Sequence, residues 1–277
     1  MSETRASESD PSPGCATPRA MSSAVSSAAR HDEQPRVSIV IPTVNESETL
    51  EQTLKVLSSL QPSPWELIVV DGHSEDATVA TAQRYGAKVL VAPIRRRAYQ
   101  LHVGAQAARG DVLAFVHADT VLRKDALAVM ATTLRDPEVA LAGFSSVMVN
   151  DEGAVQRFTT WHNAVKTYYA PMLYRPWHGL FRGLRLLFGD QVMFCRRADY
   201  QRCGGFDPAM EIMEEADLCL KLNRFGRVHQ LPERVYSSDR RVARVGAFRA
   251  NLMFFAIALG WAVGISPRRL RRVFERM

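Results

Sequence analysis

The segment DVLAFVHADT, residues 111–120, is the most informative part of this chain. Val112 to His117 is a continuous run of strand length that is apolar up to its final histidine, which predicts a central strand buried on both faces of a parallel sheet. Residues two apart in an extended segment point the same way, so His117 and Asp119 can converge on one divalent cation. Their donor atoms suit Mn²⁺ or Mg²⁺. A strand followed by a helix that Asp119 or Thr120 caps is the alternative.

Upstream of this segment, apolar runs of strand length alternate with segments of helical periodicity. Four successive strand–loop–helix units of this kind predict an α/β fold with a parallel sheet and helices on both faces. The expected strands are residues 37–41, 66–70, 87–91 and 112–117, and the expected helices end near residues 60, 85, 108 and 134.

Acidic and amide side chains follow three of these strands. They lie at Asn45-Glu46, at Asp71 to Asp76 and at His117 to Asp119. Right-handed crossovers bring such turns to one edge of the sheet, where α/β proteins bind their ligands. Because crowded acids repel one another, we expect a cation or a hydrogen-bond donor among them.

The composition is that of an ordinary globular protein with a basic balance. The 277 residues carry a formal net charge of +6, which fits an anionic partner such as nucleotide phosphates, an acidic lipid surface or nucleic acid. The four cysteines include no CxxC pair and no accompanying histidine cluster. This pattern argues against a zinc site or a disulfide framework and is compatible with a reducing cytosol.

The two ends of the chain differ from its middle. Residues 1–35 are rich in Ser, Ala and Pro without apolar periodicity, so we expect a disordered tail. Residues 239–277 contain nine arginines around the apolar run Leu252 to Ile265. Fourteen residues are too few for a membrane span, which needs about 20. A helix at a membrane interface and a helix packed on the domain both remain open.

Several motifs, taken in order, resemble family 2 glycosyltransferases with the GT-A fold. They are SIVIPTVNE, VVDGHSEDAT, GDVLAFVHADT, GDQ at 189–191, GGFD at 204–207 and MEEADLCLKL at 213–222. The segments VHADT, FGDQ and SSDRR further resemble the bacterial subgroup known as rSAM/selenodomain-associated transferase 2. The resemblance covers about residues 36–240.

The resemblance implies a GT-A domain over residues 36–238, followed by a basic and apolar helical segment, 239–277. The first half would bind the nucleotide of a sugar donor, and the second half the acceptor. The implied activity is an inverting transfer from a nucleotide diphosphate sugar, most simply a UDP-sugar, to a hydroxyl group. The subgroup suggests an acceptor of lipid or carotenoid type.

The resemblance also implies roles for individual residues on the donor side. The nucleoside would contact Pro42, Asn45, Glu46 and Asp71, and Arg97 would meet the nucleotide or its diphosphate near Gln100. Asp119, with His117, would hold Mn²⁺ or Mg²⁺, although the usual motif of the family is Asp-x-Asp. The remaining donor contacts implied are Asp190, Gln191 and Arg240.

The catalytic residues implied lie in the last two motifs. The family has Glu-Asp at the start of the last helix, with the Asp as the catalytic base, and here that position is Glu215. Glu214 is the alternative base, and Arg241 with Arg240 would approach the leaving diphosphate. Acids in a first helical turn also have a purely structural explanation, because the helix macrodipole favours them there.

These inferences predict an enzyme and name its partners. We expect a cytoplasmic glycosyltransferase without a nucleic-acid partner, able to rest on the anionic cytoplasmic face of the plasma membrane through residues 239–277. The alternative is a non-catalytic module that binds a sugar nucleotide or a membrane surface. His117 and Glu215 motivate this alternative, because the family has aspartate at both positions. A nucleotidylyltransferase is disfavoured because PTVNE replaces its Gly-rich loop, and a dehydrogenase because no strand is followed by GxGxxG.

Overall fold

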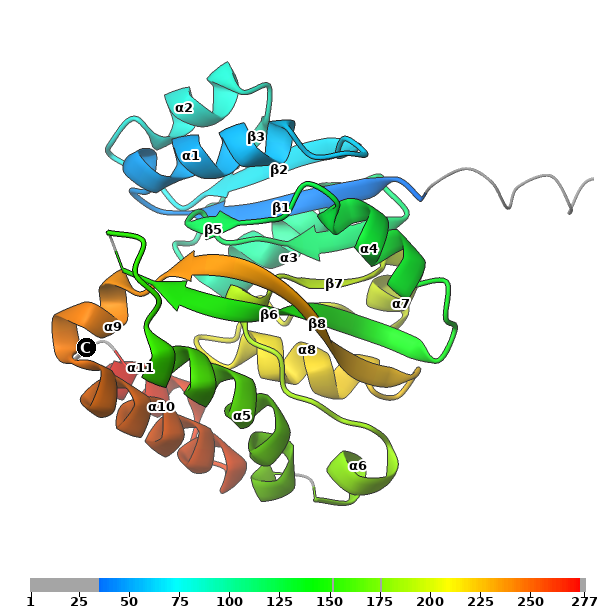
Figure 1. Cartoon of the computed structure of the whole chain (residues 1–277), viewed down its shortest axis with the longest axis vertical. Coiled ribbons are helices and arrows are strands. Elements are labelled where there is room, and N and C mark those ends of the chain that lie inside the picture. The colour runs from blue at the N-terminus through cyan, green and yellow to red at the C-terminus, as the bar shows by residue number, and fades with distance from the viewer. Residues whose placement is uncertain (1–34, 151, 175, 275–277) are drawn as a thin grey trace, which may run out of the picture. The chain divides into compact units, whose positions relative to one another are not determined.

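The computed structural model describes residues 35–150, 152–174 and 176–274, so almost all of the expected N-terminal tail lies outside the described residues. These residues form an eight-stranded sheet in the order β3-β2-β1-β4-β7-β6-β8-β5 (Figure 1). The strands are β1 (Val37–Thr43), β2 (Glu66–Asp71), β3 (Lys88–Val91), β4 (Val112–Phe115), β5 (Thr120–Val121), β6 (Val139–Val149), β7 (Met193–Arg196) and β8 (Arg227–Ser238).

The first four major strands are parallel, as the alternating pattern predicts. Strand β1 pairs with β2 on one side and with β4 on the other. The next neighbour of β4 is β7, which runs antiparallel to it, so the sheet is mixed beyond that point. The chain after Asp119 forms the short strand β5, which pairs with β8, and the alternative of a capped helix at this point is wrong.

The helices cover both faces of the sheet. Alternate residues of β1 point to opposite sides, with Val40 in one apolar core and Ile39 and Ile41 in the other. Helices α1, α2 and α4 pack on the second core, and α3, α7, α8, α10 and α11 contribute to the first. The helices are α1 (Ser47–Ser58), α2 (Thr78–Arg84), α3 (Arg97–Ala107), α4 (Ala126–Thr133), α5 (Arg157–Tyr174), α6 (Pro176–Phe181), α7 (Arg197–Arg202), α8 (Glu214–Leu222), α9 (Arg240–Val245), α10 (Ala247–Ala262) and α11 (Pro267–Phe274).

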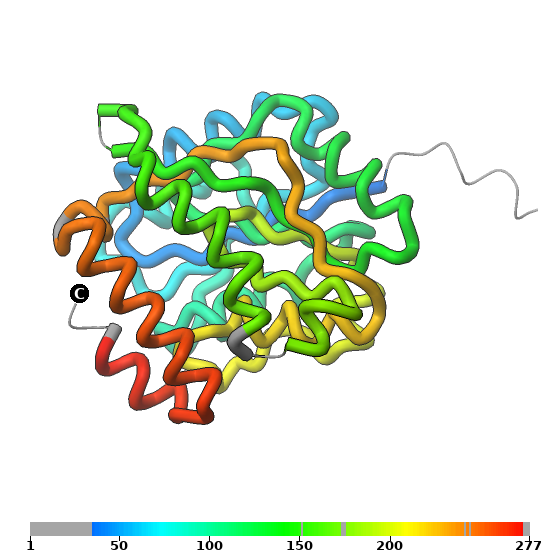
Figure 2. Tube along the Cα trace, turned by 60° about the horizontal axis from the view of Figure 1, so that its bottom comes forward, coloured from blue at the N-terminus to red at the C-terminus, as the bar shows by residue number. Residues whose placement is uncertain are grey.

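The C-terminal helices pack on the domain that precedes them. Helix α10 lies beside α5 (Figure 2), and its Ile257 and Trp261 belong to the first core. Phe248 and Leu252 of the same helix are exposed to solvent. Within residues 35–150, 152–174 and 176–274, none of the helices has the length and apolar character needed to cross a bilayer.

Candidate active site

The turns after β1 and β2 are tied together by the polar residues that the sequence singles out. Asn45 Oδ1 accepts a hydrogen bond from the Glu75 N–H at 2.8 Å. Asp71 is buried, and its carboxylate accepts hydrogen bonds from the Ser74 N–H at 2.8 Å and from Thr43 Oγ1 at 3.4 Å. Asn45 and Asp71 therefore shape this edge, and their roles toward a nucleoside stay predictions.

Gln100 of α3 forms hydrogen bonds to the ends of the same two strands. Its side chain is 3% exposed, and Nε2 donates to the carbonyl oxygens of Thr43 and Val70, each at 2.8 Å. Gly72 makes this approach possible, because a Cβ there would lie 3.0 Å from Gln100 Nε2. Gln100 thus supports the end of β1, where Pro42 lies, and the end of β2, and the contacts of Gln100 and Pro42 with the nucleotide stay predictions.

Glu46 connects the first turn to the C-terminal part of the chain. Its Oε2 lies 3.2 Å from Arg240 Nη2, and it also accepts a hydrogen bond from Thr49 Oγ1 at 2.9 Å. The ion pair brings the predicted donor-side residues Glu46 and Arg240 together across 194 positions of sequence. Arg241 follows in α9, but its side chain lies outside the described part of the structure.

Asp119 has an unsatisfied carboxylate oxygen. Its Oδ1 is buried and has no hydrogen-bond partner among the described residues. Burial, followed by the charge of Glu46, raises the pKa of Asp119 to about 6, and Arg240 and Arg97 oppose the shift. A buried acceptor of this kind is costly unless a ligand satisfies it, and a divalent cation or a donor group would do so.

Arg97 lies at the centre of the predicted site. Its Nη2 lies 2.5 Å from Glu215 Oε1, its Nε lies 3.6 Å from Glu214 Oε1, and its guanidinium contacts Nε2 of His117. Burial lowers the pKa of Arg97, but the surrounding carboxylates, led by Glu215 and Glu214, outweigh this effect and raise it. Arg97 therefore joins the start of α8 to the turn after β4.

The two acids that open α8 share one buried environment. Glu214 and Glu215 are 6% and 8% exposed, and Met213 before them has a left-handed φ of 68° that turns the chain into the helix. Burial, followed by the charge of Glu215, raises the pKa of Glu214 to about 7, and Arg97 opposes the shift. A carboxylate with a pKa near neutrality can accept a proton, so Glu214 stays a candidate base beside Glu215.

The GDQ motif forms the 3-10 helix η1 (Gly189–Gln191). Each of its three residues makes different contacts with the neighbouring elements. A Cβ on Gly189 would lie 2.1 Å from both Arg97 Nη2 and His117 Nε2, so a larger residue here would push these two side chains away. Asp190 Oδ2 accepts hydrogen bonds from Ser146 at 2.6 Å and Asn163 at 2.7 Å. Gln191 is fully buried and donates to Thr167 Oγ1 at 3.0 Å.

The residues that hold this motif in place belong to none of the motifs recognised in the sequence. Ser146 comes from β6, and Asn163, Lys166 and Thr167 come from α5, where no motif marks them. Their spacing of three and four residues gives the one available signal, because it places polar groups on one face of a helix. Lys166 is close enough to Asp190 and Glu215 for both charges to act on its pKa.

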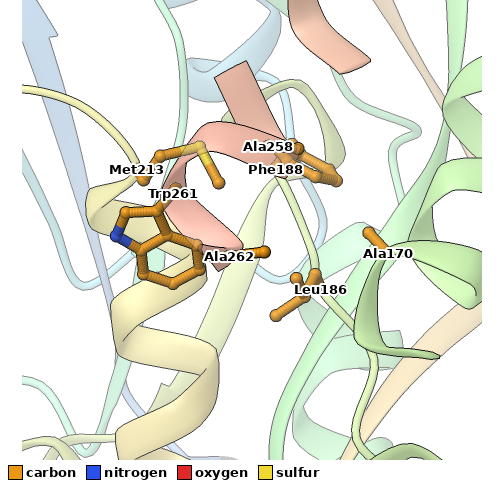
Figure 3. A pocket seen from close by; sticks show the side chains of 7 residues that line it. All are labelled: Ala170, Leu186, Phe188, Met213, Ala258, Trp261 and Ala262. Atoms are coloured by element: carbon orange, nitrogen blue, oxygen red, sulfur yellow. The ribbon is translucent and has the colours of Figure 1, made fainter. Parts of the chain in front are cut away.

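A small apolar cavity borders the site. Figure 3 shows Met213 and Trp261 next to each other on one side and Leu186 and Ala170 on the other. Phe188, Ala258 and Ala262 complete its lining. Met213 and Phe188 directly precede Glu214 and Gly189, so the apolar lining continues into the charged cluster.

The protein side chains alone do not form a complete metal centre. Across the described ranges, no three His, Cys, Asp or Glu residues are arranged to hold a metal ion. Asp119 offers a free buried oxygen, whereas His117 Nε2 faces the guanidinium of Arg97. A cation here would have Asp119 as its protein ligand and would need further oxygens from a bound molecule or water.

Solved structures of similar fold include two enzymes in complex with nucleotide sugars. A mannosyltransferase from Pyrobaculum calidifontis, in complex with GDP-mannose and Mn²⁺, has a TM-score of 0.62 and 19% identity, covering 88% of this chain and 69% of its own. Glucosyl-3-phosphoglycerate synthase from Mycobacterium tuberculosis, in complex with Mn²⁺, UDP-glucose and phosphoglyceric acid, has a TM-score of 0.56 and 20% identity, covering 83% and 80%. The mixed sheet flanked by helices is therefore the GT-A fold.

Residues 38–202 match the family model for glycosyl transferase family 2, which is more than half of the chain. An uncharacterized glycosyltransferase from Mycobacterium tuberculosis is 35% identical over 83 residues, which make up 30% of this chain and 36% of that protein. The chain belongs to glycosyl transferase family 2 and is a glycosyltransferase.

Proposed function

We propose that the protein is an inverting transferase that moves a sugar from a nucleotide diphosphate donor, most simply a UDP-sugar, to an acceptor hydroxyl. One observation carries the proposal. Arg97 contacts Glu215, Glu214 and His117, and so brings together three motifs that are far apart in the sequence. Such a cluster of acids around an arginine, at the carboxyl ends of parallel strands, suits proton transfer next to a departing phosphate group.

The donor side of the site is proposed at the edge formed by β1, β2 and β4. Asn45, Asp71 and Glu46 would meet the nucleoside, with carboxylates accepting hydrogen bonds from its hydroxyl or base N–H groups. The two structural neighbours were solved with UDP-glucose and with GDP-mannose, which supports a nucleotide sugar at this edge. They differ in the base, so the choice of UDP rests on the sequence resemblance.

The chemistry that we propose for the chain's own residues is a single displacement. Glu215 takes the proton of the acceptor hydroxyl, whose oxygen forms a bond to the anomeric carbon. The bond from that carbon to the diphosphate oxygen breaks, and the electron pair leaves with the nucleotide diphosphate. Arg97, Arg240 and Arg241 supply positive charge on the side of the leaving group.

A divalent cation fits the donor side through Asp119. The buried Oδ1, which has no hydrogen-bond partner among the described residues, and the raised pKa of this carboxylate both support a cation bound next to it. When bound, Mn²⁺ or Mg²⁺ would supply charge to the diphosphate, and the neighbours' Mn²⁺ complexes support this assignment. His117 as a second ligand requires its ring to leave Arg97.

We further propose that the helical face opposite α1 and α2 rests on an anionic bilayer. The helices α5, α6 and α10 expose a set of large apolar side chains, among them Trp177 at 71%, Phe181 at 74% and Phe248 at 74%. Exposed arginines of α11, such as Arg268 and Arg269, provide the complementary charge. A peripheral position of this kind would suit an acceptor of lipid or carotenoid type, as the resemblance to the subgroup suggests.

Release of nucleotide diphosphate from a panel of donor sugars tests the proposed reaction. The parent protein, with Mn²⁺ and a bacterial lipid extract as the acceptor source, should release UDP from at least one UDP-sugar and give a product of inverted anomeric configuration. Retention of configuration would contradict the displacement mechanism.

A further inference from the structure

Lys166 of helix α5 is near enough to the proposed base, Glu215, for the charge of that carboxylate to act on the lysine's pKa. One turn earlier, Asn163 donates to Asp190, and the adjacent Thr167 accepts from Gln191. Lys166 Nζ lies 4.0 Å from the centre of the Phe188 ring, directly before Gly189 in the chain. The lysine therefore lies beside the 3-10 helix η1 at the edge of the active site.

The ammonium group is held by aromatic rings rather than by an anion. The second ring is that of Phe254 in α10, 5.7 Å from Nζ. Within the part of the chain that the structure describes, Lys166 has no hydrogen bond and no carboxylate within salt-bridge distance. Burial lowers its pKa, whereas the more distant charges of Asp190 and Glu215 raise it. The Lys166 side chain is half-buried, so its stem packs on the protein while its ammonium group can still reach a bound anion.

We propose that Lys166 binds an acidic group, a phosphate or a carboxylate, on the acceptor substrate. The inference rests on the proposed function and names the class of acceptor for that same site. An anion at Nζ would supply the missing ion pair, and the two phenyl rings leave the ammonium free to donate hydrogen bonds.

The position of Lys166 favours the acceptor over the donor. The charges that act on Lys166 are those of Asp190 and Glu215, and Glu215 is the proposed base for the acceptor hydroxyl. The donor side is marked by Asp119, whose own electrostatic partners are Glu46, Arg240 and Arg97. Phe188, which contacts the ammonium group of Lys166, also lines the small apolar cavity (Figure 3), so the surroundings of Lys166 away from the donor side are apolar.

The alternative is that Lys166 only offsets the charge of Asp190 and Glu215. In that case, added anions would shift the NMR signal of Lys166 no more than the signals of the other lysines. The chain has five lysines, Lys55, Lys88, Lys124, Lys166 and Lys221, so each can be observed separately.

The test is carbon NMR of the full-length protein with ¹³C-dimethylated lysines, in which Lys166→Arg identifies the Lys166 signal. UDP with Mg²⁺ is added first, and then glycerol 3-phosphate, glycerate or the uncharged control glycerol. We expect the Lys166 signal to shift saturably with the two acids and not with glycerol, and its titration midpoint to move to higher pH. Lys55, which is exposed on α1, should change only in proportion to ionic strength.

A Lys166 response equal to that of Lys55 would overturn the proposal. A Lys166 shift that is complete on addition of UDP, before any acid is present, would also overturn it by assigning the lysine to the donor. UDP binding is recorded in the first step from the remaining signals and by calorimetry, so a failure of the donor site is distinguishable from a failure at Lys166.

A matched set of variants gives a second readout. Calorimetry of glycerol 3-phosphate on the UDP complex should show an affinity at least about tenfold lower for Lys166→Met than for the parent, with a smaller loss for Lys166→Arg and none for Lys55→Met. Affinity for UDP should be the same in all four proteins. Equal affinity of the parent and Lys166→Met for glycerol 3-phosphate would contradict the assignment.

Discussion

Glu215 is the residue whose replacement separates sugar transfer from donor binding most directly. Glutamine keeps the shape of the side chain and can still accept a hydrogen bond from Arg97, but it cannot take a proton. We expect Glu215→Gln to lower the rate of transfer at least about 100-fold while the affinity for UDP changes little. Nucleotide release and calorimetry on the same preparations measure the two quantities.

Glu214→Gln is the matched variant for that experiment, because Glu214 lies next to Glu215 and also pairs with Arg97. A smaller loss of transfer is expected for Glu214→Gln. Full activity of Glu215→Gln together with an inactive Glu214→Gln would instead make Glu214 the base.

The raised pKa of Glu214 predicts a specific pH dependence of stability. Its ordinary pKa is 4.5 and its pKa in the fold is about 7, so the folded state binds the proton more tightly than the unfolded state. The stabilising effect of this proton is complete below about pH 4.5 and is lost as the pH rises through about 7.

Chemical denaturation between about pH 5 and pH 8 measures this effect. Over this range, the free energy of unfolding of the metal-free parent should fall more than that of Glu214→Gln, by on the order of 2 kcal/mol. Parallel pH profiles for the two proteins would show that Glu214 titrates normally.

At the scale of elements, Gln100 supports the paired ends of β1 and β2. Gln100→Leu removes both hydrogen bonds to the carbonyl oxygens of Thr43 and Val70. We expect a loss of about 1–3 kcal/mol in the free energy of unfolding, and weaker UDP binding because the turns lose their support. Gln83→Leu, an exposed change in α2, is the control and should leave both quantities unchanged. Equal free energies of unfolding for the two variants would show that the hydrogen bonds of Gln100 do not stabilise the fold.

The elements of the first half of the fold could be predicted from sequence, because each apolar run of strand length is followed by a helical pattern. The turns of Asn45, Asp71 and Asp119 accordingly lie at the carboxyl ends of strands β1, β2 and just beyond β4. The antiparallel placement of β7 between β4 and β6 could not be predicted, since pairing between distant strands leaves no local pattern.

The candidate site likewise contains residues that could be predicted from the sequence and residues that could not. Glu214, Glu215 and Arg97 follow from motifs, and the structure brings them into contact. Lys166 has no motif, and its position depends on how α5 packs over η1 and α10, which is a tertiary property.

At the scale of the whole molecule, the C-terminal helices both complete the core and expose an apolar face. The double variant Phe248→Ser, Leu252→Ser should therefore lower binding to vesicles that contain phosphatidylglycerol without lowering the melting temperature. Cosedimentation measures binding, and added salt should weaken it for the parent. Trp65→Ser, at an exposed apolar residue next to β2, is the control. Equal vesicle binding by the parent and the double variant would contradict the proposed bilayer contact.

The chain belongs to glycosyl transferase family 2, and Asp119 lies at the proposed donor side. We therefore expect a divalent cation on Asp119 to assist the binding of a nucleotide diphosphate. Calorimetric titration of UDP, with and without Mn²⁺, tests it most directly on the parent, on Asp119→Ala and on the control Asp125→Ala, an exposed acid paired with Arg123. Mn²⁺ should tighten UDP binding at least about tenfold in the parent and in Asp125→Ala, and not in Asp119→Ala. UDP affinity that is the same in all three proteins, with or without Mn²⁺, would contradict the assignment of Asp119.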